Sequence, residues 1–224
     1  MRHVFSLTRG DPMPIPVTRT VKRSAVIFLV AAGGMMWVPV TQLLLGHPPR
    51  FLRDLGFFSG PRGTLLAWSL GLVIAVLYSA YAIRNIPLVR EHWRAISFVK
   101  LLGVLVAVAA AVVEEAFFRR LLMNALMRAG WSTVAQVIAS GLVFGVAHAS
   151  WALVTGRVVI GVGAMIATGT LGTALGLVYV LGDRSLAPVI VAHFVVTATI
   201  QPGIMFAAFS GQMRQDAPPT VHAA

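Results

Sequence analysis

The chain has 224 residues, of which 58% are hydrophobic and only 11% are charged. A soluble domain carries about 45–50% apolar and about 25% charged residues, so this composition excludes a soluble globular protein. The net charge of +11 alone would suit a nucleic-acid-binding protein, but the mean hydropathy of +0.84 indicates that the basic residues flank membrane spans. There is no cysteine, which excludes disulfides, thiolate metal sites and a cysteine nucleophile.

Six apolar segments follow one another along the chain, and each is roughly long enough to cross about 30 Å of hydrocarbon as a helix. They cover residues 24–45, 64–83, 97–118, 132–154, 158–181 and 186–209. In the third segment, hydropathy ends the span near Phe118, although the helical pattern continues to a break at Gly130. We predict an all-α fold, a polytopic transmembrane helical bundle of about six spans.

These spans define the organisation of the chain. Residues 1–23 are expected to form a basic cytoplasmic arm, 24–94 two N-terminal spans with their loops, 95–209 a membrane core and 210–224 a polar tail. Six full crossings divide the 18 Lys and Arg residues 11 to 7 in favour of the N-terminal side, which favours a cytoplasmic N-terminus. We expect a multi-pass protein of the bacterial cell (inner) membrane, with the lipid bilayer as a partner and nucleic acid excluded. No sequence pattern predicts an oligomeric state.

Most charges fall in loops, and the ionisable residues inside the predicted helices are Glu114, Glu115, Arg119, His148 and His193. Such groups are costly to place in a bilayer, so they are candidates for a functional site. Residues four apart on a helix share a face, whereas adjacent residues diverge by about 100°. Glu115 is therefore expected to pair with Arg119. Glu114 has no cation on its own helix and is available as a general base.

The spacing around Gly130 brings two of these residues to one level. Glu114 lies sixteen residues before Gly130, and His148 lies eighteen residues after it. If the two helices are antiparallel, both residues lie roughly 25 Å from the turn. In the last span, His193 and Thr197 share one face. We predict a site formed between helices three, four and six.

The polar residues form three short motifs. They are Glu-Glu-x-x-x-Arg (Glu114, Glu115, Arg119), Phe-x-x-x-His (Phe144, His148) and His-x-x-x-polar (His193, Thr197). In this order, on successive apolar helices, they resemble the three motifs of the CAAX protease and bacteriocin-processing (CPBP) family, intramembrane proteases related to the Ras-converting CAAX endopeptidase. The resemblance covers roughly residues 95–205. It implies an endopeptidase that cleaves a peptide or membrane-protein substrate in or near the bilayer. We expect that no cofactor is required, with zinc as the alternative.

The resemblance also implies roles for the first two motifs. Glu114 would activate a water that His148 helps to hold and polarise. Glu115 and Arg119 would brace the site.

In the third motif, His193 and the residue four positions on would stabilise the oxyanion of the tetrahedral intermediate. The family commonly has Asn at that second position, whereas this chain has Thr197, whose hydroxyl is shorter and offers one donor. Gln201 lies one turn further along the same stripe and is an alternative donor if the geometry allows it.

A zinc-dependent version of the same hydrolysis is the nearest mechanistic alternative. Glu114, His148 and His193 offer one carboxylate and two imidazoles, a ligand set that suits catalytic zinc. The sequence has no His-Glu-x-x-His helix. Glu115 would then have to be the base, although Arg119 should keep its basicity low. We therefore favour the metal-independent mechanism.

A serine nucleophile is the other alternative. Rhomboid-type proteases place a nucleophilic serine before glycine in a span, as Ser140 and Gly141 are placed here, but Ile138 stands where that pattern has glycine. We interpret Ser140 as a small packing residue.

Two functions outside proteolysis are compatible with the same residues. Glu114 and the histidines could form the relay of a proton-coupled transporter, although the sequence shows no internal repeat. A non-catalytic membrane scaffold would keep the family fold without the activity. Thr197 favours this function, because it stands where the family commonly has Asn.

Overall fold

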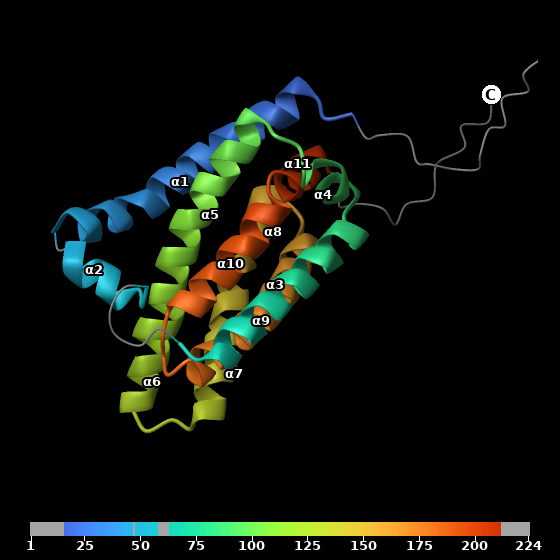
Figure 1. The fold of residues 1–224 in the computed structure, drawn as a ribbon. Helices are drawn as coiled ribbons and strands as arrows, with labels where there is room; N and C mark the ends of the chain where they lie inside the picture. The colour runs from blue at the N-terminus through green and yellow to red at the C-terminus, as the bar shows by residue number, and fades with distance from the viewer. Residues whose placement is uncertain (1–15, 47, 58–62, 212–224) are drawn as a thin grey trace, which may run out of the picture.

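The structure is a computed structural model that describes residues 16–46, 48–57 and 63–211. Most of the predicted basic arm, residues 1–15, and most of the predicted tail, residues 212–224, lie outside the described residues. In the described part, every regular element is a helix (Figure 1). This confirms the predicted all-α helical bundle.

Twelve helical elements follow one another in the described residues. They are α1 (Arg19–Gly46), α2 (Pro48–Asp54), α3 (Leu65–Asn85), α4 (Pro87–His92), α5 (Phe98–Glu115), the π-helix η1 (Ala116–Met123), α6 (Asn124–Arg128), α7 (Thr133–His148), α8 (Trp151–Thr155), α9 (Val158–Leu181), α10 (Ala187–Ile200) and α11 (Gly203–Ser210).

Five helical stretches in the described residues are long and apolar enough to cross a membrane. They are Arg19–Gly46, Leu65–Asn85, Phe98–Arg128, Thr133–Thr155 and Val158–Leu181. A sixth crossing is possible only through α10 and α11 together, which are bent by 52° with respect to each other. The chain is therefore an integral multi-pass membrane protein, and the predicted last span is a bent pair of helices.

The predicted end of the third span near Phe118 was wrong. The span continues without interruption through η1 and α6 to Arg128. Half of its most apolar window is buried inside the protein, against 22–28% for the other four spans. Glu115 and Arg119, which are both 0% exposed, can therefore lie at membrane depth because they face protein and not lipid.

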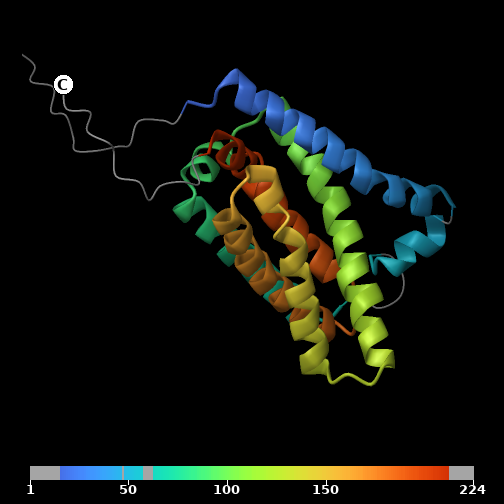
Figure 2. The ribbon, with the colours of Figure 1, turned by 180° about the vertical axis from the view of Figure 1, so that it is seen from behind.

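Side-chain caps and turns define the ends of the helices around the bundle core. Thr64, Ser97 and Ser132 each accept a hydrogen bond from the backbone N–H three residues on, and so begin α3, α5 and α7. Gly130 has φ +80° in the connection between α6 and α7, which confirms the predicted break. The connection makes α5–α6 and α7 an antiparallel hairpin (Figure 2).

Close packing of α7 against α9 depends on small residues. A Cβ added to Gly145 would lie 2.5 Å from the Met165 carbonyl oxygen, and one added to Gly141 would lie 2.8 Å from the Thr173 backbone nitrogen. The two backbones can approach this closely only without those side chains.

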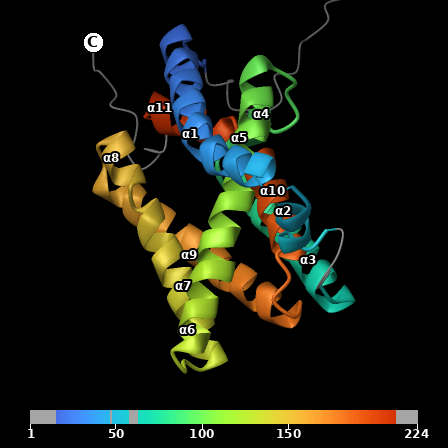
Figure 3. The same ribbon diagram turned by 90° about the vertical axis from the view of Figure 1, so that its left-hand side faces the viewer.

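The central helix α5 contacts α1 on one side and α10 on another, and α3 packs against α10. Figure 3 shows α1 crossing in front of α5, with α7 and α9 lying side by side. The end of α5 therefore lies beside the middle of α10, and the last residue of α7 reaches the same region.

Candidate active site

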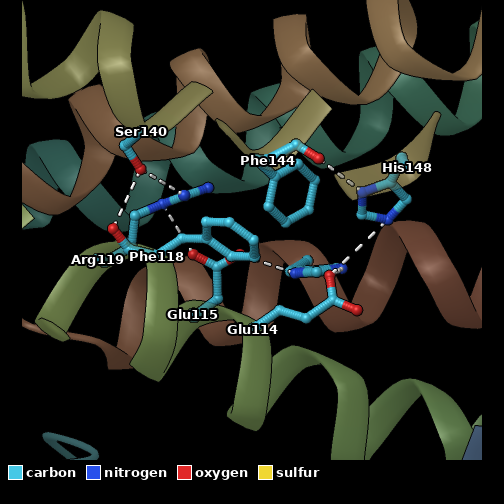
Figure 4. A network of polar contacts seen from close by, with 8 residues as sticks. Glu114, Glu115, Phe118, Arg119, Ser140, Phe144 and His148 are labelled. Carbon is cyan, nitrogen blue, oxygen red and sulfur yellow. Dashed lines mark hydrogen bonds and ion pairs between the residues drawn. The ribbon is translucent and has the colours of Figure 1, made fainter. Parts of the chain in front are cut away.

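Polar side chains from three helices meet inside the bundle (Figure 4). Glu114 and Glu115 are the last two residues of α5, and Arg119 lies in η1. His148 ends α7, and His193 lies in the middle of α10. The structure thus brings together five of the six residues singled out in the sequence, between the helices that were predicted to hold them.

Glu115 is the centre of a fully buried chain of charges. One of its carboxylate oxygens, Oε2, lies 3.0 Å from Nε of Arg119, and both side chains are 0% exposed. The other oxygen, Oε1, accepts a hydrogen bond of 2.8 Å from Nδ1 of His193. A buried carboxylate with a cation on one oxygen and an imidazole on the other is held in one orientation, so Glu115 has little freedom to act as a base.

Ser140 extends this chain to α7, a role that the sequence analysis missed. Arg119 donates a hydrogen bond of 2.9 Å to the Ser140 hydroxyl, which in turn donates one of 3.1 Å to the Phe118 carbonyl. The hydroxyl proton is therefore directed to a carbonyl and not to a base, unlike that of an activated nucleophile. The spacing of Ser140, Phe144 and His148 on one stripe of α7 was the sequence signal that could have identified it.

Glu114 faces both histidines and lies in a more open position than Glu115. Its Oε2 is 3.9 Å from Nε2 of His148 and 3.8 Å from Nε2 of His193. The side chains of Glu114 and His148 are 17% and 23% exposed, whereas that of His193 is 6% exposed. Within the described residues, Oε2 of Glu114 has no hydrogen-bond partner. This oxygen is itself buried, and a buried carboxylate oxygen without a partner needs a donor from a water or a substrate.

The partners of the two Nδ1 atoms indicate which ring nitrogens face Glu114. Nδ1 of His148 lies 2.9 Å from the Phe144 carbonyl oxygen, and a carbonyl can only accept, so this nitrogen carries the proton. In a neutral His148 ring, Nε2 is then the acceptor. Nδ1 of His193 is likewise engaged by Glu115, so both Nε2 atoms are directed at the same carboxylate oxygen.

The Phe144 ring packs against the histidines and the arginine. Its centroid lies 4.6 Å from that of His148, 5.8 Å from that of His193 and 4.9 Å from that of Phe118. The guanidinium carbon of Arg119 lies 5.3 Å from the same ring. Phe144 is 1% exposed, so the ring is fixed by packing and limits the rotation of both imidazoles.

The π-helix η1 begins directly after Glu115 and was not predicted. Its hydrogen bonds connect residues five apart and widen the turn, and such turns occur frequently at functional sites. On η1 the side chains of Phe118, Arg119 and Met123 are all buried. No proline or glycine marks this segment in the sequence.

Thr197 and Gln201 do not join the Glu114 group. Thr197 lies one turn beyond His193, is half-buried, and its side chain forms no hydrogen bond with another described residue. Gln201 instead packs against Gly103, where an added Cβ would be 2.9 Å from its Oε1. Gly103 precedes Glu114 by eleven residues, about 16 Å along the helix, so Gln201 does not fit the alternative oxyanion role.

The end of α10 is held by Lys100 of α5. Its ammonium group donates hydrogen bonds to the carbonyl oxygens of Ala198, Thr199 and Gln201, at 2.5, 3.3 and 2.6 Å. A cation at a helix C-terminus stabilises the carbonyls that have no partner inside the helix.

The distances between the three candidate zinc ligands are longer than those between the ligand atoms of a zinc site. Ligand atoms of a tetrahedral zinc ion with bonds of about 2.0–2.1 Å lie about 3.3 Å apart. The observed separations of 3.8 and 3.9 Å are longer, and no group of three His, Asp or Glu side chains among the described residues is arranged to hold a metal ion. Two hydrogen bonds of about 2.8 Å to one shared water would span these separations.

Comparison with known proteins gives one match. Residues 96–199 match the family model described as Rce1-like, type II CAAX prenyl endopeptidase. Searches of curated proteins and of solved structures found no match. The matched segment contains all seven residues of the three sequence motifs, from Glu114 to Thr197. The match over residues 96–199 supports membership of the family of CAAX proteases, the CPBP family of integral membrane proteases.

Proposed function

We propose that this protein hydrolyses a peptide bond at the bilayer by a water that Glu114 and His148 activate. The observation that carries the proposal is the position of two imidazole Nε2 atoms, 3.8 and 3.9 Å from one unpartnered oxygen of Glu114. The family match supports a membrane endopeptidase of the CAAX type, and hence a peptide substrate.

The geometry supports a specific position for the water. A water between Oε2 of Glu114 and Nε2 of His148 can donate one hydrogen bond to each, because the carboxylate and the neutral ring nitrogen are both acceptors. Its lone pairs then point away from both groups, towards the carbonyl carbon of a bound peptide. Both acceptors also raise the electron density on the attacking oxygen.

The reaction requires two proton transfers. Glu114 takes the proton of the water as its oxygen forms the bond to the carbonyl carbon, and then gives a proton to the leaving amine as the C–N bond breaks. The carbonyl oxygen becomes an oxyanion between these steps. His193 is proposed to stabilise it, because Glu115 holds Nδ1 and, in the protonated ring, Nε2–H can donate to the oxyanion. Thr197, one turn away, is proposed as a second donor.

Substitution of Glu114 by Gln tests the proposal. The amide keeps the shape of the side chain and cannot take the proton, so cleavage of a reporter peptide by the full-length protein in liposomes should fall by at least about 100-fold. His148→Gln should lower kcat by about 10²–10⁴-fold. The matched control is Glu91→Gln, an exposed acid on α4, which should leave cleavage unchanged. Full activity of the Glu114→Gln protein would refute the proposed role.

A further inference from the structure

A second polar cavity lies away from the Glu114 group, where α9 ends and α10 begins. It has a volume of about 310 Å³, and Arg120, Asn124, Tyr179, Arg184, Ser185 and Leu186 are among its lining residues. None of the residues that line it belongs to the Glu114–His148–His193 group. It is therefore a separate site.

Arg184 brings a positive charge to this cavity without a carboxylate to balance it. Its guanidinium donates hydrogen bonds to the amide oxygens of Asn124 and Gln136, at 2.7 and 2.6 Å, and both amides are neutral. Among the described residues, no carboxylate forms an ion pair with Arg184. The neighbouring carboxylate of Asp54 instead pairs with Arg120 at 3.0 Å. The two amides fix the guanidinium in place and leave its charge for a ligand.

The residues that follow Arg184 add a side-chain hydroxyl and a helix N-terminus. Ser185 is 3% exposed, and its hydroxyl has no hydrogen-bond partner among the described residues. Leu186 is the N-cap of α10 and provides no side-chain acceptor for the first turn. A helix N-terminus carries a partial positive charge and backbone N–H groups that attract anions. The carboxylates of Asp54 and Asp183 also line the cavity, beside the guanidiniums of Arg53, Arg120 and Arg184. Three cations against two anions leave the lining with a net positive charge.

The depth of the cavity indicates the source of the anion. Leu181 ends the span formed by α9, and the lining residues Arg184, Ser185 and Leu186 follow directly. Residues just beyond the end of a span lie at the level of the lipid headgroups, and basic pockets between helices at this level suit anionic headgroups. Since the cavity shares no residue with the Glu114 group, it suits a lipid better than the carboxylate of a peptide bound at Glu114.

We propose that the cavity at Arg184, Ser185 and the N-terminus of α10 binds a phosphate group, carried by an anionic phospholipid or by a free phosphate ester. The phosphate would accept hydrogen bonds from the guanidinium and from the Ser185 hydroxyl. Its negative charge would balance Arg184 and lie at the positive end of α10.

Thermal unfolding of the full-length protein in detergent tests this site. Phosphatidylglycerol at about 100 times its Kd should raise Tm by about 5–10 °C. Glycerol 3-phosphate, which has no acyl chains, distinguishes a free ester from a lipid, and diacylglycerol, which has no phosphate, should have no effect. If glycerol 3-phosphate alone reproduces the shift, the phosphate site is supported and its source is a free ester.

Two variants and one control assign the shift to this cavity. Arg184→Gln should raise the Kd for phosphatidylglycerol at least tenfold. Ser185→Ala removes only the unpartnered hydroxyl, so it should fold normally and still weaken binding by about 3–10-fold. Arg128→Gln, an exposed basic residue at the end of α6 and outside the cavity, should bind like the unmodified protein.

Three results would overturn the proposal. The first is an unchanged Kd in both the Arg184→Gln and Ser185→Ala proteins, and the second is an equal loss in the Arg128→Gln control, which would indicate general surface charge. The third is an Arg184→Gln protein that binds the lipid with an unchanged Kd, while its KM rises only for those peptides that have a free C-terminal carboxylate. That result would assign the cavity to the peptide.

Discussion

Replacement of Arg119 by Met would leave the Glu115 carboxylate buried without its cation. Both side chains are 0% exposed and their charged atoms lie 3.0 Å apart, so water cannot take the place of the guanidinium. Removing one partner of a buried ion pair costs about 3–5 kcal/mol, which is more than a hundredfold in the unfolding equilibrium. Reversible unfolding of the purified protein in mixed micelles would measure this loss.

The neighbouring Arg120 provides a matched control. It pairs with Asp54 at the same distance of 3.0 Å, but the two side chains are 43% and 34% exposed. Arg120→Met should therefore cost only about 0–1 kcal/mol. The double variant Glu115→Gln/Arg119→Met should regain at least half of the Arg119→Met loss, because a neutral amide can still accept from His193 and needs no cation. Equal losses for Arg119→Met and Arg120→Met would refute this reasoning.

Three further results are expected. Gly141→Ala should destabilise the protein by about 1–3 kcal/mol, because its new Cβ would meet the backbone of Thr173, whereas Gly163→Ala, with nothing within 4 Å, should not; thermal unfolding compares the two. Ser140→Ala should lower stability by about 1–3 kcal/mol by removing the acceptor of a buried guanidinium, and a serine-directed phosphonate should not label the unmodified protein. Cleavage should survive dialysis against a zinc chelator, and a loss that added zinc restores would instead support the zinc-dependent mechanism.

Short-range regularities of a helix predicted part of the candidate site. The four-residue spacing of Glu115 and Arg119 predicted their ion pair, which is present at 3.0 Å. The nearly equal distances of Glu114 and His148 from Gly130 predicted that they lie at one level, and Oε2 of Glu114 is 3.9 Å from Nε2 of His148. Both predictions needed only the rise of a helix and one turn.

Contacts between distant segments were not predictable in the same way. The hydrogen bond from His193 to Glu115 joins residues 78 positions apart and depends on how α10 packs against α5, which no local pattern specifies. Hydropathy also ended the third span near Phe118, because a hydropathy average treats Arg119 as exposed to lipid when it is in fact enclosed by protein. The widened turn of η1 has no marker residue in the sequence.

The attachment of Lys100 to the end of α10 has a consequence for how the site accommodates different peptides. Helix α5 is bonded to α10 at two levels. Lys100 donates to the last carbonyls of α10, and Glu115 accepts from the His193 imidazole. Two attachments on one axis prevent α10 from both sliding along α5 and turning about itself. The proposed base on α5 and the proposed oxyanion donor on α10 are therefore held at a fixed separation. We expect the site to adjust to the size of a substrate through movement of α7, which ends at His148.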